Sequence, residues 1–329
     1  MVEGDPPTMH DVAARAGVAL SSVSRVLSKH PDVSEKMRAR VLQAAAELDY
    51  EPDYLAQSLR LGSTMTVGFT VRDISNPIFA GIAKGAETAL RQRGYSMLMA
   101  DSEGDPDVEL SHLTLFKRRR VDGYILSLAS EIHGPTFAAL TTLGRPMVVV
   151  DRDVPSLNVG VVLCDHYLGA RDAVSHLLAL GHTRIAFISG EERLRATRER
   201  LRGYRDAHAA AGVKVDEKLL SQGRYAEEYG SDAAEAALKM ARPPTGIFAG
   251  GLQLSIGALS ALRARNLTLG SGFGFVACDA LPIMRVLEPG LSVVSRDPVE
   301  IGQQTAAELM RQIDGQPPST TVVPTTFVP

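Results

Sequence analysis

The side chains with the clearest chemical potential lie in one short segment, Asp11–Arg25, with the sequence DVAARAGVALSSVSR. Gly17 divides it into two helical stretches, because glycine readily adopts the positive φ that a tight turn requires. The second stretch carries Leu20, Ser21 and Arg25. A guanidinium can donate two hydrogen bonds to guanine O6 and N7, and a leucine offers an apolar contact, for instance to a thymine methyl group. Two helices joined in this way are typical of a helix-turn-helix, whose second helix enters the DNA major groove.

Helix-start signals position this segment. Thr8 and Asp11 have the spacing of a capping box, in which a hydroxyl and a carboxylate satisfy free backbone N–H groups. Pro31 breaks the chain after the second helical stretch, and Ser34 caps a third helix. We therefore expect a three-helix headpiece over residues 1–50.

Charge alone does not indicate a nucleic-acid partner, because the formal net charge of the chain is −3. The basic residues are clustered, however, since Arg15–Arg40 holds six Lys or Arg against two acidic residues. This local patch is sufficient for phosphate contacts, while the acidic residues from Glu47 to Asp53 should weaken non-specific binding.

The bulk composition indicates an ordinary soluble protein of two or three domains, with 329 residues, 45% hydrophobic and 22% charged. We find no run of 18 apolar residues, and Met1–Pro7 lacks the features of a secretory signal, so a cytoplasmic location is expected. Cys164 and Cys278 are the only cysteines, and both lie in apolar stretches. We interpret them as buried thiols and expect no disulfide, metal or cofactor.

From Met65 onward, apolar strand-like runs alternate with amphipathic helices. The expected strands are 65–71, 95–100, 121–128, 146–151, 159–163, 184–189, 245–250 and 272–278. This alternation predicts parallel sheets covered by helices on both faces. The fold class is thus an all-α headpiece followed by α/β, with two doubly wound parallel-sheet subdomains and a ligand between them at the carboxyl ends of the strands.

The predicted division of the chain has three parts. After the headpiece, residues 51–64 form a hinge helix and linker, in which Tyr54–Leu59 is too short to be a stable helix alone. Residues 65–329 form a two-lobed domain for effector binding and dimerisation. Its first lobe is assigned to 65–162 and 293–320, and its second lobe to 163–292 and 321–329.

The headpiece, the YEPDYLAQSLR linker and the two-lobed body resemble, in this order and over essentially the whole chain, the LacI family of bacterial transcriptional regulators. Further segments match the family pattern: Ile74–Pro77 with Phe79, His176–Gly190, Arg200–Tyr204 and Leu287–Val294. The resemblance implies a periplasmic-binding-protein-like body and a homodimer on a pseudopalindromic DNA operator. It also implies an operator affinity that a sugar, nucleoside, nucleobase or related effector adjusts. We expect a repressor.

The resemblance also implies which residues contact DNA. On the second helix, Leu20 and Ser21 would choose the operator sequence, and Arg25 would contact bases. In the linker, Leu59 would enter a base step in the minor groove, with Ala56 small enough for close approach. The full expected set is Thr8, Leu20, Ser21, Ser22, Ser24, Arg25, Ser34, Tyr50, Ala56 and Leu59. The alternatives are that Ser21 only caps its helix, that Arg25 is a solvated charge, and that the linker makes no DNA contact.

For the effector, the resemblance implies a set of seven residues between the lobes. Phe79 and Tyr225 would lie against a ligand ring, Arg200 would grip hydroxyls or carboxylates, and Asp279 would accept ligand hydroxyls. Ser127 and Asp151 end strands that face the same crevice. The full set is Phe79, Ser127, Asp151, Arg200, Tyr225, Leu252 and Asp279. A core phenylalanine and a surface arginine remain alternative interpretations of Phe79 and Arg200.

Two positions depart from the family pattern. Asp53 stands where asparagine is usual, which either weakens DNA affinity or caps the hinge helix. Leu252 stands where an acidic residue is usual, so hydrogen bonds to a sugar hydroxyl would be lost. This second departure predicts a less polar or differently oriented effector than a simple hexose.

Other functional classes are disfavoured. A solute-binding protein would share the two-lobed body but not the headpiece. An enzyme is disfavoured because no GxGxxG opens the first helix of the body, and neither GxxxxGK[ST] nor a metal-spaced His/Cys cluster occurs. An activator, or a regulator controlled by a partner protein, remains open. No leucine heptads follow the body, so a dimer is expected rather than a tetramer.

Overall fold

The structure is a computed structural model that describes residues 7–28, 30–51, 62–270, 272–279 and 291–329. By their internal contacts, the residues form two compact units, Met1–Thr64 and Met65–Pro329. No helix in the described part of the chain has both the length and the apolar character needed to cross a membrane.

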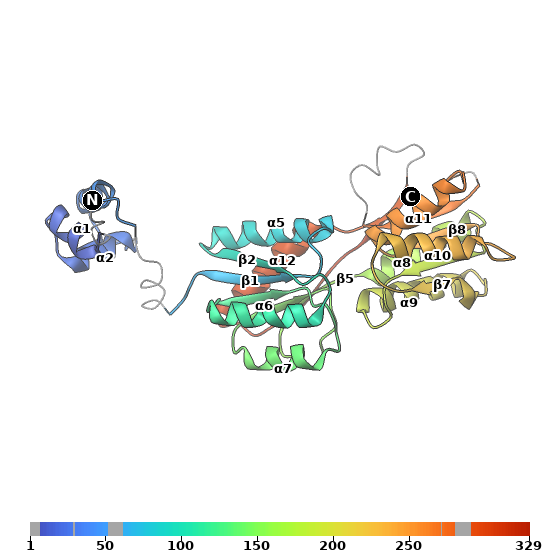
Figure 1. Ribbon diagram of the computed structural model, residues 1–329, viewed down its shortest axis with the longest axis horizontal. Coiled ribbons are helices and arrows are strands. Elements are labelled where there is room, and N and C mark those ends of the chain that lie inside the picture. Colours follow the sequence, from blue (N-terminus) through green and yellow to red (C-terminus); the bar gives the residue numbers. More distant parts are fainter. Residues whose placement is uncertain (1–6, 29, 52–61, 271, 280–290) are drawn as a thin grey trace, which may run out of the picture. The chain divides into compact units, whose positions relative to one another are not determined.

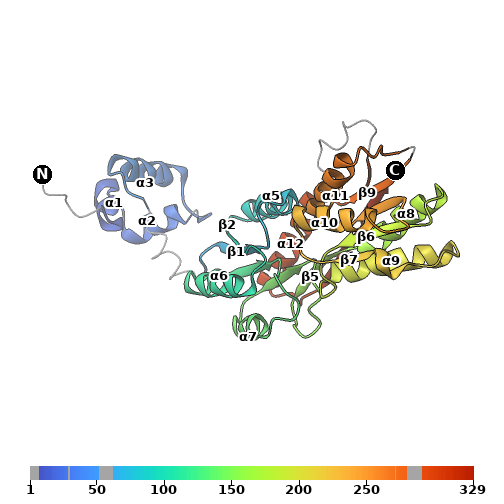
Figure 2. The same cartoon turned by 45° about the vertical axis from the view of Figure 1, so that its right-hand side comes forward.

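The headpiece consists of three helices around a small apolar core. These are α1 (Met9–Ala16), α2 (Leu20–Leu27) and α3 (Glu35–Glu47) (Figures 1 and 2). Each helix contributes one valine that is entirely buried, namely Val12, Val23 and Val41. Because the buried residues of each helix lie on one face, the opposite face is exposed to solvent or a partner.

The turn between α1 and α2 is fixed by local and tertiary hydrogen bonds. Thr8 and Asp11 form the predicted capping box at the start of α1, and Gly17 ends that helix with a φ of 61°. From α3, the guanidinium of Arg40 donates a hydrogen bond of 2.5 Å to the carbonyl of Ala16. The third helix therefore holds the turn that sets the direction of α2.

The second unit contains two six-stranded sheets, one in each lobe. The first sheet has the order β11-β5-β4-β3-β1-β2 with parallel pairings, and the second has the order β12-β10-β9-β8-β6-β7, in which only the β10–β12 pair is antiparallel. The strands of the first sheet are β1 (Thr66–Val71), β2 (Ser96–Asp101), β3 (Gly123–Leu126), β4 (Met147–Val150), β5 (Gly160–Cys164) and β11 (Thr320–Val323). Those of the second are β6 (Ile185–Ser189), β7 (Leu220–Gln222), β8 (Gly246–Ala249), β9 (Gly274–Cys278), β10 (Ser292–Ser295) and β12 (Thr326–Val328). The predicted fold class is confirmed.

Helices cover both faces of each sheet, so the central strands are buried throughout. In the first lobe, α5 (Pro77–Gln92) and α12 (Pro298–Ile313) pack on one face, and α6 (Pro106–Arg118) and α7 (Gly134–Thr142) on the other (Figure 1). In the second lobe, α10 (Glu227–Leu238) and α11 (Leu252–Ala264) lie opposite α8 (His166–Ala179) and α9 (Arg195–Ala210). A short 3-10 turn at Glu217–Leu219 precedes β7. Burial on both faces explains the continuous apolar runs of β3, β4, β8 and β9.

The division between the lobes differs from the expected one. Strand β10 pairs with β9, so 292–295 belongs to the second lobe, although 293 was expected to open a segment of the first. Strand β11 pairs with β5, so 320–323 belongs to the first lobe, although 321 was expected to return to the second. The chain thus changes lobes after β5, β10 and β11. An apolar run predicts a strand but not its sheet, because pairing depends on contacts distant in sequence.

Candidate functional site

Helix α2 presents a polar face to solvent. Leu20, with 38% of its surface exposed, Ser21 and Arg25 lie on this face, while Val26 is turned into the core. The cap of the helix is Ala19, so the interpretation of Ser21 as a helix cap is wrong. The Arg25 guanidinium forms no ion pair with any described residue. The exposed set therefore has the composition and spacing that major-groove reading requires.

The other expected DNA contacts are distributed differently. Thr8 and Ser34 are exposed, and their hydroxyls cap α1 and α3. Ser22 and Ser24 are half-buried on α2, and Tyr50 packs against the headpiece core. The two linker residues of the set, Ala56 and Leu59, lie outside the described residues, as does Asp53. All ten assignments stay predictions.

A cavity lies between the lobes, where the carboxyl ends of strands from both sheets meet. The space between the protein atoms there, open solvent included, is about 680 Å³. All seven predicted effector residues line it: Phe79, Ser127, Asp151, Arg200, Tyr225, Leu252 and Asp279. They converge because each lies just after a strand or in the first two turns of a helix, at the same edge of its sheet. Sequence reasoning missed the four charged residues that also line the cavity, Arg72, Asp73, Arg152 and Arg296.

Arg296 is the centre of a buried ionic network that joins the two lobes. Its guanidinium donates to both carboxylate oxygens of Asp279, at 2.8 and 3.0 Å, and to Asp151 at 2.8 Å. Asp151 follows β4 of the first lobe, and Asp279 follows β9 of the second. Both have positive φ, 54° and 62°, a conformation that aspartate tolerates better than most residues. One arginine thus bridges two carboxylates from different lobes.

Charges in this network determine which groups are ionised. Burial alone would raise the pKa of Asp151, but the hydrogen bond from His166 and the charge of Arg296 hold it well below its ordinary value. Burial would likewise raise the pKa of Asp279, and Arg296 and Arg200 hold it down. Burial lowers the pKa of His166 to about 4, although Asp151 opposes this shift. His166 is therefore neutral near pH 7 and donates a hydrogen bond to Asp151.

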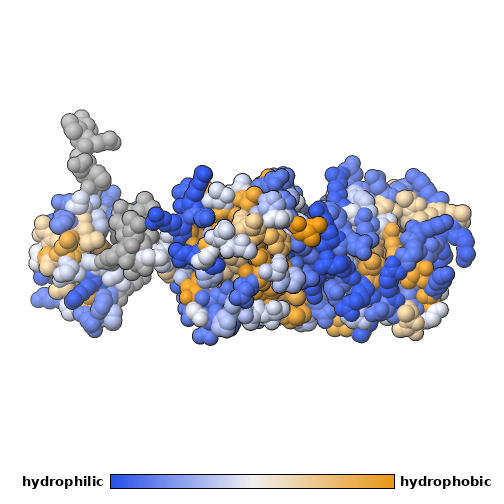
Figure 3. All heavy atoms as spheres, turned by 90° about the horizontal axis from the view of Figure 1, so that it is seen from below, coloured by the Kyte–Doolittle hydropathy of each residue, from blue (hydrophilic) through white to orange (hydrophobic). Residues whose placement is uncertain are grey.

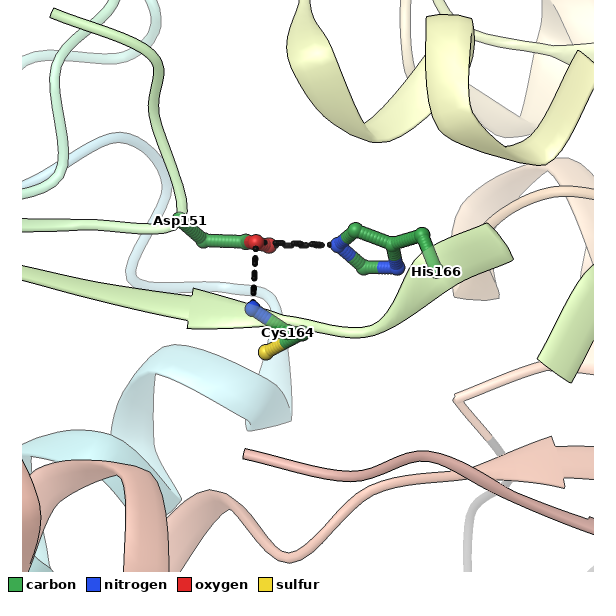
Figure 4. A group of neighbouring side chains, drawn as sticks. All are labelled: Asp151, Cys164 and His166. Atoms are coloured by element: carbon green, nitrogen blue, oxygen red, sulfur yellow. Dashed lines mark hydrogen bonds and ion pairs between the residues drawn. The ribbon is translucent and has the colours of Figure 1, made fainter. Parts of the chain in front are cut away.

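Three buried side chains, Asp151, Cys164 and His166, have the types and proximity of metal ligands (Figure 4). The arrangement does not fit a metal ion, however, because a cation already occupies the position between them. The guanidinium of Arg296 lies 2.8 Å from Asp151 and 3.4 Å from the sulfur of Cys164. Burial also raises the pKa of Cys164 to about 12, so the thiol holds its proton. We interpret the group as part of the ionic network.

Both rims of the cavity are bridged between lobes. At one rim, Gln253 of α11 donates to Asp73 at 2.7 Å and accepts from Asn76 at 3.3 Å. At the other, Glu131 accepts from the guanidinium of Arg198 at 3.0 Å and from the backbone of Arg195 at 2.9 Å. On the side of α7 and α9, hydrophilic side chains gather where the lobes meet (Figure 3). Polar contacts therefore join the two lobes at two separate places.

The chain is similar to known proteins over almost its whole length. Residues 8–53 match the model for bacterial regulatory proteins of the lacI family, and residues 174–329 match a periplasmic binding protein-like domain. The HTH-type transcriptional regulator DegA of Bacillus subtilis (strain 168) is 32% identical over 300 residues, 90% of this chain and 88% of DegA. The chain belongs to the LacI family.

Two further relatives support this membership. The HTH-type transcriptional repressor CytR of Escherichia coli (strain K12) is 30% identical over 311 residues, 94% of this chain and 90% of CytR. The structure of the transcriptional regulator CelR with cellobiose is 30% identical, covers 98% of both chains and has a TM-score of 0.75. This LacI-family protein is thus a sequence-specific DNA-binding transcription regulator, and repression fits its relatives.

The body of this LacI-family protein contains a carboxyl group that should titrate near neutral pH. Burial raises the pKa of Glu109 to about 7, against the hydrogen bond from the Ala129 amide and the charge of Arg152. A raised pKa means that the fold favours the protonated form. The stabilisation is complete below pH 4.5, the ordinary value, and is lost as pH rises to about 7.

Glu109→Gln should abolish this pH dependence, because the amide keeps an oxygen for the Ala129 N–H and cannot ionise. As pH rises from 5 to 8, we expect the free energy of unfolding of the variant to increase by about 2–3 kcal/mol relative to that of the parent protein. Urea unfolding of both proteins across this range measures the difference. A constant difference between the two would show that Glu109 is ionised throughout.

Proposed function

We propose that this protein is a homodimeric repressor whose operator affinity is set by a small molecule held between the lobes. The observation that carries the proposal is the cavity itself. The seven residues expected at an effector from the family resemblance all line one space between two lobes. Contacts across both rims and through Arg296 make the relation of the lobes sensitive to what fills that space.

Several features support the DNA-binding half of the proposal. The exposed face of α2 offers Leu20, Ser21 and Arg25, and a dimer would present this face twice. Two-fold protein symmetry is matched by a pseudopalindromic operator. Because operator DNA is the target, we place the protein in the cytoplasm. The relative CelR was solved with cellobiose, so a sugar or related metabolite is the class of effector to test first.

The proposal is tested by selecting DNA sites from random duplexes with the purified protein and then screening metabolites for compounds that change the affinity for the selected site. We expect an enriched pseudopalindrome bound by one dimer, and at least one active compound. Phe79→Ala should weaken binding of that compound about tenfold or more, because the ring lines the cavity. Without the compound, the variant should bind the operator with the same affinity as the parent protein. Enrichment of no pseudopalindrome, or equal compound affinity in Phe79→Ala, would contradict the proposal.

A further inference from the structure

Three arginines in the cavity have no carboxylate partner. Arg72 and Arg200 line the cavity together with Arg152, and none of the three lies within 4.0 Å of a carboxylate in the described part of the chain. Arg152 donates to the carbonyls of Leu128 and Asp151, both at 2.8 Å, so its charge is not neutralised there. Arg152 and Arg200 are 6% and 4% exposed.

The cavity's acidic residues, in contrast, are engaged elsewhere. Asp151 and Asp279 bind Arg296, and Asp73 accepts from the Gln253 amide at 2.7 Å. The first residue of α11, which faces the same space, is Leu252, so this side of the cavity adds no negative charge. The Gln253 amide does not neutralise Asp73, so the lining holds four arginines against three aspartates, an excess of one positive charge.

Tyr225 brings two of the free guanidiniums together. Arg200, from α9 of the second lobe, donates to the Tyr225 hydroxyl at 3.1 Å. Arg72 follows β1 of the first lobe, and its guanidinium lies over the Tyr225 ring, 5.0 Å from the centroid. The two cations thus approach one tyrosine from different lobes.

An arrangement of this kind is unfavourable unless something compensates it. Withdrawing a guanidinium from water without a partner carries a large desolvation cost. Burial lowers the pKa of Arg72, and the charge of Arg152 lowers it further. Tyr225, Asp73 and Glu191 act in the opposite direction, and the pKa of Arg72 still lies below its ordinary value. The cavity therefore favours an occupant that carries negative charge.

We propose that the effector is an anion, whose phosphate or carboxylate group binds between Arg72 and Arg200 beside Tyr225. This inference rests on the proposed function, because it assumes that the cavity between the lobes is the effector site. Guanidiniums bind both groups through paired hydrogen bonds. An anion held by one arginine from each lobe would also stabilise the closed relation of the lobes.

The proposal changes the expectation drawn from Leu252 alone. The absence of a carboxylate at this position alone predicts a less polar or differently oriented effector. Because three arginines of the same lining lack a carboxylate partner, the consequence of Leu252 is instead a stronger preference for negative charge. The half-buried ring of Phe79 offers an apolar surface for an uncharged sugar-like part beside the anionic group.

Matched pairs of compounds test the proposal. The full-length protein is titrated by calorimetry and thermal unfolding with ribose and ribose 5-phosphate, and with glucose, glucose 6-phosphate and glucuronate. Inorganic phosphate is included as a probe without a sugar. The anionic members should bind about 10- to 100-fold more tightly than their neutral counterparts, the range expected for charge-assisted hydrogen bonds. The phosphate and carboxylate arms distinguish the two forms of the anionic group.

The Arg72→Met variant tests whether Arg72 binds the anionic group. Arg91→Met is the matched control, because Arg91 is an exposed arginine of α5 paired with Glu87. Arg72→Met should abolish the preference for the anionic member of each pair, while Arg91→Met keeps it. Without ligand, Arg72→Met should unfold at the same temperature as the parent protein or higher, because an uncompensated charge is removed. A merely structural Arg72 would lower that temperature.

The proposal is overturned if a neutral sugar binds as tightly as its anionic derivative, or if none of the anions, inorganic phosphate included, stabilises the protein. It is also overturned if Arg72→Met keeps the preference. These outcomes are separable from failure of the proposed function. A neutral compound that binds in the cavity and changes operator affinity would contradict the anionic effector. It would still agree with the proposed regulation by a small molecule.

Discussion

Arg25→Ala is expected to abolish operator selectivity in this LacI-family regulator while leaving weak, sequence-independent DNA binding. Arg25 is exposed on α2 beside Leu20 and Ser21, and the buried Val23 and Val26 fix the opposite face of the helix in the headpiece core. A bidentate contact to guanine discriminates by about 1–3 kcal/mol, and a dimer would lose it at both half-sites. The predicted loss of specific affinity is therefore roughly 30-fold to 10⁴-fold.

The measurement is a titration of the parent and variant proteins with the selected operator and with a scrambled duplex, at one fixed salt concentration. Lys36→Ala is the matched control, because Lys36 is an exposed cation of the same headpiece. Lys36→Ala should weaken binding to both duplexes to a similar extent, as the loss of a phosphate contact does. If Arg25→Ala kept the parent protein's ratio of specific to non-specific affinity, the assignment of α2 as the reading helix would be wrong.

The second large effect is expected from Arg296→Met. This change leaves Asp151 and Asp279, both buried, without the cation that lies between them. Removing one partner of a buried ionic network costs about 3–5 kcal/mol, because the remaining carboxylates stay buried with less compensating charge. The variant should unfold at a markedly lower urea concentration than the parent protein, and the two lobes should lose a principal contact.

A combined variant separates the charge effect from loss of packing. Arg296→Met with Asp151→Asn and Asp279→Asn removes all three charges and keeps similar volumes. This combination should recover most of the lost stability, because no unpaired charge remains buried. Parent-like stability of Arg296→Met alone would show that the network contributes little to the fold.

The headpiece was predictable from sequence because its signals are local. The capping box at Thr8, the glycine at position 17 and the valine spacing on α2 each act within one or two helical turns. The α/β class was predictable for a related reason, since buried parallel strands require continuous apolar runs. Both predictions depended on neighbours in sequence, where the chain leaves few alternatives.

The ionic network was not predictable in the same way. Arg296 follows β10 directly, as Arg72 follows β1, and a search for the first polar residues after each strand would have found both. Which carboxylates Arg296 reaches, however, depends on β10 joining the second sheet while the next helix returns to the first. That crossing is set by tertiary pairing between segments distant in sequence.

The measurement that tests the central account most directly is the thermodynamic coupling between the cavity and the operator. The Kd for the selected operator is measured with and without the compound that binds the cavity most tightly, and the Kd for the compound is measured with and without operator. The account predicts that both constants change by the same factor, about 5- to 150-fold, because linkage is reciprocal. A compound that binds in the cavity with equal affinity for the free and the operator-bound protein would contradict it.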